Sequence, residues 1–114
     1  MTQKAEACNV KKIAAVDVRD FEGMERILRV LANKTSLAIL YAVYDNEEAC
    51  ACELEPALKL DQPPITNYLR KLYLAGILKK REQWRYTFYS VSDEYRDFVS
   101  KLRINSPPVV KTGK

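Results

Sequence analysis

Two cysteines one residue apart are the side chains of this sequence best suited to chemistry. Cys50 and Cys52 stand on either side of Ala51, and the 114-residue chain has one other cysteine, Cys8. A thiolate is a nucleophile and a ligand for soft ions, and the N-terminus of a helix favours the thiolate form. On an ideal helix the two side chains point about 200° apart, so they share one ion only if Cys50 lies at the helix N-terminus or just before it. Oxidation of the same thiols is the alternative chemistry.

Other kinds of reactive site are missing from the sequence. The chain has no histidine, which excludes a Ser-His-Asp triad, a Cys-His dyad and a Cys2His2 zinc site. No nucleophile and base pair and no phosphate-binding glycine loop is visible, so we expect no enzyme. The odd number of cysteines argues against a disulfide framework, and no apolar run approaches the ~18 residues of a membrane span. We therefore expect a cytoplasmic protein without a membrane segment.

Positive charge is concentrated in the second half of the chain. Residues 1–60 carry 8 basic and 10 acidic side chains, whereas residues 61–114 carry 11 basic and 5 acidic side chains. Between residues 62 and 91 the only acidic side chain is Glu82. The basic side chains of that stretch are Arg70, Lys71, Lys79, Lys80, Arg81 and Arg85. Such a compact basic patch indicates a polyanionic partner.

Apolar residues recur at intervals of three and four along most of the chain, the spacing typical of amphipathic helices. This spacing predicts helices over residues 21–31, 37–44, 50–58, 63–75 and 93–102. Asn33 is a candidate N-cap of the second helix, and Gly76 is expected to end the fourth as a C′ glycine. Residues 77–80 and 85–91 are predicted to form two short strands around a turn at residues 82–84. The expected fold is mainly α-helical with a small β-hairpin.

The helix predicted over residues 63–75 has one apolar and one polar face. Ile65, Leu69 and Leu72 lie within about 60° of one another on a helical wheel and form the expected buried face. Polar and cationic side chains fall roughly opposite, with Tyr68 and Tyr73 on the flanks. These outward side chains are Thr66, Asn67, Arg70 and Lys71.

An ordered set of motifs over residues 20–105 resembles the ArsR/SmtB family of dimeric winged-helix repressors. The stretch LRVLANKTSLAILYAV is similar to the lead-in of its helix-turn-helix, and WRYTFYSV to its second wing strand. Between them lie a Cys-x-Cys before Glu-Leu, a Gln-Pro before the recognition helix and an Ala-Gly-Ile-Leu after it. The resemblance implies an arm at residues 1–18, a dimeric winged helix-turn-helix domain at 19–105 and a tail at 106–114. It also implies a homodimeric repressor that binds a palindromic operator in double-stranded DNA.

The resemblance assigns the helix over residues 63–75 to the major groove and the hairpin, or wing, to the flanking phosphates. The base-edge or groove candidates are then Gln62, Thr66, Asn67, Tyr68 and Arg70. The phosphate candidates are Lys71, Lys79, Lys80, Arg81 and Arg85. Where family members often carry a histidine pair or Ser-His, this helix has Asn67 and Tyr68, so the operator sequence does not follow from the resemblance.

The resemblance also implies an inducer. The CACEL sequence at residues 50–54 is similar to the Cys-Val-Cys-Asp-Leu box of the family's arsenic sensors, which points to arsenic(III) or antimony(III), with cadmium, lead and bismuth as further candidates. Arsenic(III) and antimony(III) prefer three sulfurs. Cys8 is the candidate third ligand, because the family's lead and cadmium sensors recruit arm cysteines to this site. The family's zinc and nickel site on the last helix is rejected, since the carboxylates there lack histidine partners.

Two further expectations concern partners. The apolar stripes at residues 21–31 and 95–102 are expected to form the dimer interface, or else only to complete the core of the monomer. Two alternatives to an inducible metal-binding repressor stay open: a thiol redox-responsive winged-helix regulator, and a non-regulatory nucleic-acid or protein interaction module. In the last case aromatic residues stack on the partner or on bases. The candidates are Trp84, Tyr86, Phe88 and Tyr89.

Overall fold

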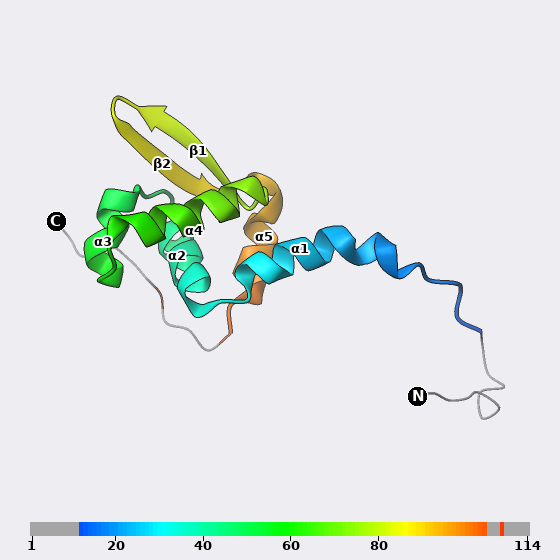
Figure 1. Ribbon diagram of the computed structural model, residues 1–114. Coiled ribbons are helices and arrows are strands. Elements are labelled where there is room, and N and C mark those ends of the chain that lie inside the picture. The colour runs from blue at the N-terminus through cyan, green and yellow to red at the C-terminus, as the bar shows by residue number, and fades with distance from the viewer. Residues whose placement is uncertain (1–11, 105–107, 109–114) are drawn as a thin grey trace.

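The computed structural model describes residues 12–104 and 108, which form five α-helices and a two-stranded antiparallel β-hairpin (Figure 1). A 3-10 turn at Val18–Phe21 leads into the first helix. The helices are α1 (Glu22–Leu31), α2 (Lys34–Asp45), α3 (Ala51–Leu58), α4 (Gln62–Leu74) and α5 (Asp93–Leu102), and the strands are β1 (Leu78–Gln83) and β2 (Tyr86–Val91). The expected class, mainly α-helical with one hairpin, is confirmed. Within the described residues no single helix is long and apolar enough to cross a membrane, and Val18–Leu31 with Lys34–Asp45 reaches that length only across a 90° bend.

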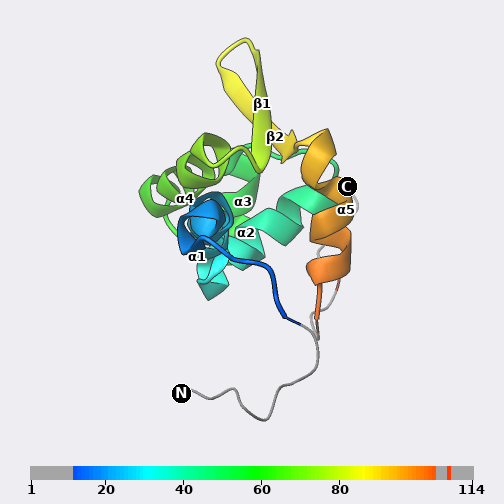
Figure 2. The ribbon, with the colours of Figure 1, turned by 90° about the vertical axis from the view of Figure 1, so that its right-hand side faces the viewer.

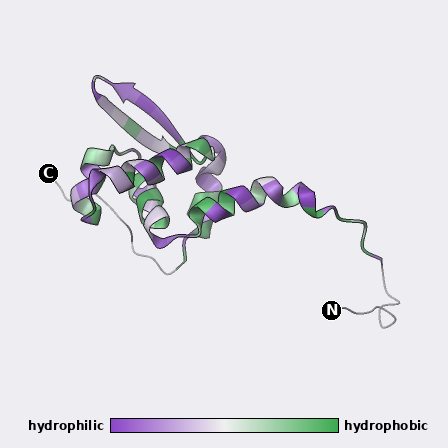
Figure 3. Ribbon diagram, in the orientation of Figure 1, coloured by the Kyte–Doolittle hydropathy of each residue, from purple (hydrophilic) through white to green (hydrophobic). Residues whose placement is uncertain are grey.

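Helix α2 lies at the centre of the fold. Its Ile39, Leu40 and Val43 are fully buried. Helix α4 packs on α2 and α3 through the three side chains predicted for its buried face, Ile65, Leu69 and Leu72. Burial of one such side chain contributes about 1.5–3 kcal/mol. This packing holds α4 with its polar face toward solvent, next to a β1 strand that is hydrophilic along most of its length (Figure 3).

The helix ends follow from residues that stop or start a helix for local reasons. Asn33 has extended backbone angles, and its Oδ1 accepts hydrogen bonds from the backbone N–H of Thr35 at 2.9 Å and Ser36 at 3.1 Å. Helix α4 begins with prolines in its first turn, where a missing N–H costs little. Gly76 follows α4 with φ of 87°, and its N–H donates to the carbonyl of Tyr73, as in a C-terminal glycine motif. The predicted N-cap and C′ glycine are confirmed.

The hairpin turn lies later than the sequence analysis placed it. Glu82 and Gln83 belong to β1, and the turn consists of Trp84 and Arg85, with Gln83 paired to Tyr86. The predicted turn at residues 82–84 and the start of the second strand at residue 85 are therefore wrong. The reason is that β1 is exposed on both faces after Leu78, so its sequence lacks the apolar alternation that marks a half-buried strand.

Helix α5 is tied to α2 at its C-terminal end. The guanidinium of Arg103 donates two hydrogen bonds to the Asp45 carboxylate, at 2.9 and 2.7 Å, and lies over the ring of Tyr41. The Tyr41 hydroxyl donates to the backbone carbonyl of Val99 at 2.6 Å. Burial raises the pKa of Tyr41, so the phenol remains a neutral donor. These contacts fix α5 against the core.

Replacing Asn33 by alanine removes the oxygen that caps α2, so we predict a loss of about 1 kcal/mol in the free energy of unfolding. Asn33→Asp keeps an acceptor in the same place and should stay within about 0.5 kcal/mol of the parent protein. Urea denaturation followed by circular dichroism measures both variants. Equal stability of the alanine variant and the parent would contradict the capping role.

Candidate functional site

The two neighbouring cysteines meet at the N-terminus of α3. Cys50 is the residue before the helix, with extended backbone angles, and Cys52 is the second helical residue. Their Cα atoms are 5.4 Å apart, and their sulfurs are joined as a disulfide. Because Cys50 precedes the helix, the separation of about 200° on an ideal helix does not apply. Both sulfurs therefore reach one point without unwinding α3, as the sequence analysis required for a shared ion.

The surroundings of the two sulfurs differ. Cys50 is 4% exposed, whereas Cys52 is exposed. The N–H of Cys50 donates to Oε1 of Glu53 at 3.1 Å, which closes the first turn of α3. The site is therefore anchored in the core on one side and open on the other.

The third predicted ligand, Cys8, lies outside the described residues. Among residues 12–104 and 108, no group of three or more histidine, cysteine or acidic side chains is arranged to hold a metal ion. The described part of the chain thus provides two sulfurs.

The residues before Cys50 are attached to both strands of the hairpin. The N–H and carbonyl of Ala49 pair with the carbonyl and N–H of Tyr89 on β2, at 2.9 and 2.8 Å. The Glu48 carboxylate accepts two hydrogen bonds from the guanidinium of Arg81 on β1, at 3.1 and 2.8 Å. This bonding raises the pKa of Arg81. These contacts could not be predicted from the sequence, because their only signal is a pair of opposite charges 33 residues apart.

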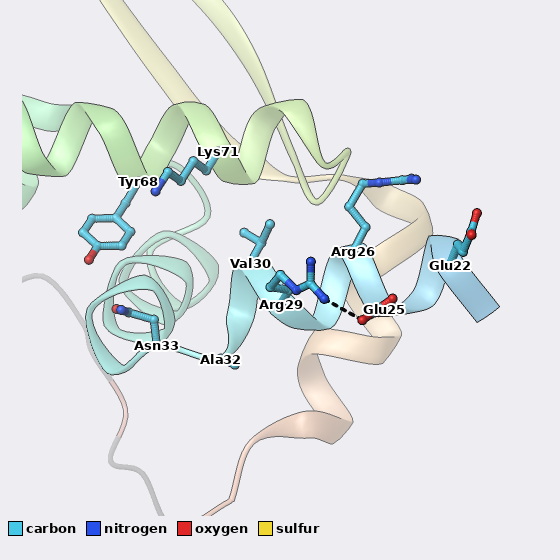
Figure 4. Close-up of a pocket in the computed structure, with 9 residues that line it drawn as sticks. All are labelled: Glu22, Glu25, Arg26, Arg29, Val30, Ala32, Asn33, Tyr68 and Lys71. Atoms are coloured by element: carbon cyan, nitrogen blue, oxygen red, sulfur yellow. Dashed lines mark hydrogen bonds and ion pairs between the residues drawn. The ribbon is translucent and has the colours of Figure 1, made fainter. Parts of the chain in front are cut away.

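The predicted DNA-contacting residues of α4 fall into two groups. Gln62, Thr66, Asn67 and Arg70 are exposed and line one shallow groove along the solvent face of the helix. Tyr68 and Lys71 lie on the other side and face α1 across a pocket of about 530 Å³ (Figure 4). The other pocket residues are Glu22, Glu25, Arg26, Arg29, Val30, Ala32 and Asn33. Tyr68 also packs against the core. Only the first group shares one open face.

The basic residues of the hairpin differ in what they already contact. Lys79 Nζ is 3.6 Å from the Asp93 carboxylate, and Lys80 Nζ lies 4.5 Å from the centre of the Tyr73 ring. Arg81 is bound to Glu48 as described above. Within the described part of the chain, Arg85 makes no ion pair. Arg85 is therefore the guanidinium of the hairpin that a phosphate could reach without displacing a carboxylate.

Comparison with known proteins agrees with this arrangement. Residues 33–80 match the model of bacterial regulatory proteins of the arsR family. The chain is 32% identical over 82 residues to an uncharacterized HTH-type transcriptional regulator of Methanocaldococcus jannaschii, covering 72% of this chain and 92% of that protein. The chain belongs to the ArsR family. It is thus a winged-helix transcriptional regulator and not an enzyme, in agreement with the sequence analysis.

Two further relatives are similar to this ArsR-family chain. The arsenical resistance operon repressor of Escherichia coli is 30% identical over 77 residues, which cover 68% of this chain and 66% of the repressor. The structure of reduced HlyU from Vibrio cholerae is 27% identical, with a TM-score of 0.66 over 75% of this chain and 90% of HlyU. Helix α4 is the recognition helix of the shared fold, and the hairpin β1–β2 is the wing.

Substitutions on the two sides of α4 should affect DNA binding differently. We predict that Asn67→Ala lowers the preference for a duplex enriched from a random library over a scrambled duplex by about tenfold, since one base contact discriminates by about 1–3 kcal/mol. Lys71→Ala, on the side toward α1, should leave this ratio unchanged. Fluorescence anisotropy with both duplexes measures the ratio. An equal loss in the two variants would argue against the division of the helix.

Proposed function

We propose that this ArsR-family protein is a homodimeric repressor that binds a palindromic operator and releases it when arsenic(III) or antimony(III) binds the thiolates of Cys50 and Cys52. One observation carries the proposal: the two sulfurs lie together at the N-terminus of α3, directly before the recognition helix. The similarity to the arsenical resistance operon repressor supports the choice of inducer.

The donor set fits a thiophilic ion. Two adjacent thiolates suit soft ions better than they suit magnesium or calcium, which take oxygen ligands. Arsenic(III) and antimony(III) take a third sulfur, for which Cys8 is our candidate. Cadmium, lead and bismuth are the alternative thiophilic ions at the same pair. The disulfide is the oxidised form of the pair and has no thiolate to offer, so binding requires prior reduction.

The contacts around the pair offer a route from the thiols to the DNA-binding surface. Cys50 directly follows Ala49, whose backbone pairs with Tyr89 on β2. The preceding residue, Glu48, accepts hydrogen bonds from Arg81 on β1. A change in the Cys50 backbone on ligation therefore moves the anchor of the wing. Release follows only if the inducer binds the free form more tightly than the DNA-bound form.

The dimer proposal rests on an apolar surface formed by α1 and α5. Phe21, Met24 and Leu28 are 50%, 58% and 44% exposed, and Phe98 of α5 is also exposed. Leu28 also lines an apolar groove of about 710 Å³ between α1, α2 and the end of α5. Large apolar residues of this kind mark a surface that another molecule covers. Val99 and Leu31 belong instead to the monomer core. Each of the two predicted stripes therefore has residues that complete the core and residues that we assign to the dimer interface.

A second candidate function uses the same cysteines as a redox switch. The observation in its favour is the disulfide between Cys50 and Cys52. An oxidant such as peroxide takes two electrons from the two thiols, which form the disulfide and lose two protons. Family membership does not favour the remaining alternative, an interaction module without a regulatory role.

Serine variants of the cysteines test the inducer site. We predict that Cys50→Ser and Cys52→Ser each bind the operator like the parent protein but are no longer released by arsenite or antimonite under reducing conditions. The reason is that a hydroxyl is a poor ligand for a soft ion. Electrophoretic mobility shift with reduced protein measures release, and Cys8→Ser should weaken the response if the arm supplies the third sulfur.

The outcomes of this experiment separate the two candidate functions. If the double Cys50/Cys52 serine variant still leaves the operator at the arsenite concentration that releases the parent, the metalloid site is elsewhere. If arsenite has no effect on the reduced parent while peroxide releases it, the redox function replaces the metalloid function.

A charge on α1 tests the proposed dimer. We predict that Leu28→Glu converts the dimer to a monomer at micromolar concentration, because it places a carboxylate in the apolar surface. Arg26→Glu, with its side chain on a different face of the same helix, is the matched control and should remain dimeric. Sedimentation velocity without DNA distinguishes the two states. A dimeric Leu28→Glu variant would move the interface away from α1.

A further inference from the structure

The tip of the wing carries an aromatic side chain that the fold does not use. Trp84 is the only tryptophan of the chain and is 91% exposed. It occupies the two-residue turn between β1 and β2. Figure 2 shows the hairpin standing away from the helices, with this turn at its far end. Trp84 thus lies at the tip of the wing, with its indole in solvent.

The backbone at this position makes a tryptophan an unfavourable choice. Trp84 has φ of 63°, in the left-handed region, where glycine and asparagine fit with little or no strain and a bulky side chain is strained. The exposed indole gains no burial to offset this strain. A strained residue at an exposed tip is a reason to look for a function outside the fold.

The surroundings of Trp84 indicate which partner it meets. Its neighbour in the turn is Arg85, which makes no ion pair among the described residues. The rest of the wing is mostly basic, with Lys79, Lys80 and Arg81 against Glu82. A cationic hairpin that ends in an exposed aromatic ring combines attraction to phosphates with a flat apolar surface. Double-stranded DNA offers both a phosphate backbone and base edges.

The position of the wing indicates which groove it reaches. Strand β1 follows α4 through Gly76 and Ile77, so the wing flanks the helix assigned to the major groove. The neighbouring minor groove is about 6 Å wide, which admits side chains of a turn but not a two-stranded ribbon. Apolar side chains that enter this groove partly unstack a base step, and pyrimidine–purine steps unstack most easily.

We propose that Trp84 is a specificity-determining contact with the DNA minor groove, where its indole packs against a pyrimidine–purine step while Arg85 contacts the adjacent phosphates. This inference rests on the proposed DNA binding and adds to it a preference at base pairs that α4 does not touch. The strained turn holds the indole outward before DNA arrives.

The single tryptophan reports directly on this contact. On addition of an enriched duplex to the full-length protein, we expect the emission of Trp84 to change and its quenching by acrylamide, a neutral quencher, to fall severalfold. A scrambled duplex that binds weakly should protect the indole less. Unchanged quenching at saturating duplex would overturn the proposal, since an indole in the groove cannot stay fully accessible.

Variants separate stacking from charge. Trp84→Gly removes both the indole and the backbone strain. Its melting temperature should therefore equal or exceed that of the parent. Its affinity for the enriched duplex should fall about tenfold, the scale of a base–aromatic contact. Its salt dependence should not change. Arg85→Gln should instead lower the slope of log affinity against log salt by roughly 1. If Trp84→Gly and the parent bind the enriched duplex with equal affinity, the proposed role of Trp84 is overturned, while the proposed DNA binding stands.

Selection from a random library tests the base preference. Duplexes enriched with the parent should carry pyrimidine–purine steps in the minor groove that the wing protects from hydroxyl radicals, and those enriched with Trp84→Gly should lack them. Identical preferences would overturn the specificity role.

If the parent enriches no duplex, both the DNA-binding proposal and this inference fail. If acrylamide protection depends on protein concentration without DNA, Trp84 meets a second copy of the chain instead.

Discussion

The packing of α4 on α2 is the contact on which the other features of this protein depend. Three fully buried side chains of α4, Ile65, Leu69 and Leu72, fix the rotation of the helix about its own axis. A helix side chain cannot change face without moving this set, because residues three and four apart share one face. The same packing places Gly76 and the start of β1, so it also decides where the wing leaves the body. Recognition helix and wing are thus oriented by one apolar interface.

Much of this interface follows from local rules, and the sequence predicts it well. The apolar spacing of α4, the Asn33 cap and Gly76 depend on residues within one or two helical turns of each other. The wing is different, because β1 buries only Leu78 and therefore has no apolar pattern to locate its end. The pairing of Glu48 with Arg81 joins residues 33 apart, which no periodicity predicts. A helical wheel likewise places Lys71 opposite the buried face, but only the position of α1 shows that it borders a pocket.

The cysteine pair links two chemistries that exclude one another. In the proposed function, metalloid ligation and disulfide formation use the same two thiolates, so the redox state of Cys50 and Cys52 would set how much of the protein can respond to a metalloid. Cys50 is buried and Cys52 is exposed, so the two residues have different roles in this site. The first holds the site to the core beside Ala49, and the second is open to solvent. Either chemistry therefore acts on the same short connection between α2 and α3.

The two prolines at the start of α4 have a consequence for how the protein holds a DNA backbone. The first four N–H groups of a helix have no partner within it and often bind phosphate oxygens. In α4 two of these positions are Pro63 and Pro64, which leaves only Asp61 and Gln62 to donate from the main chain. The recognition helix therefore offers a weakened anion site at its tip, while its first turn is stiffened in advance by the proline rings. In the proposed complex with DNA, the phosphates would therefore be held mainly by cationic side chains, and the first turn of α4 would be ordered before it meets the groove.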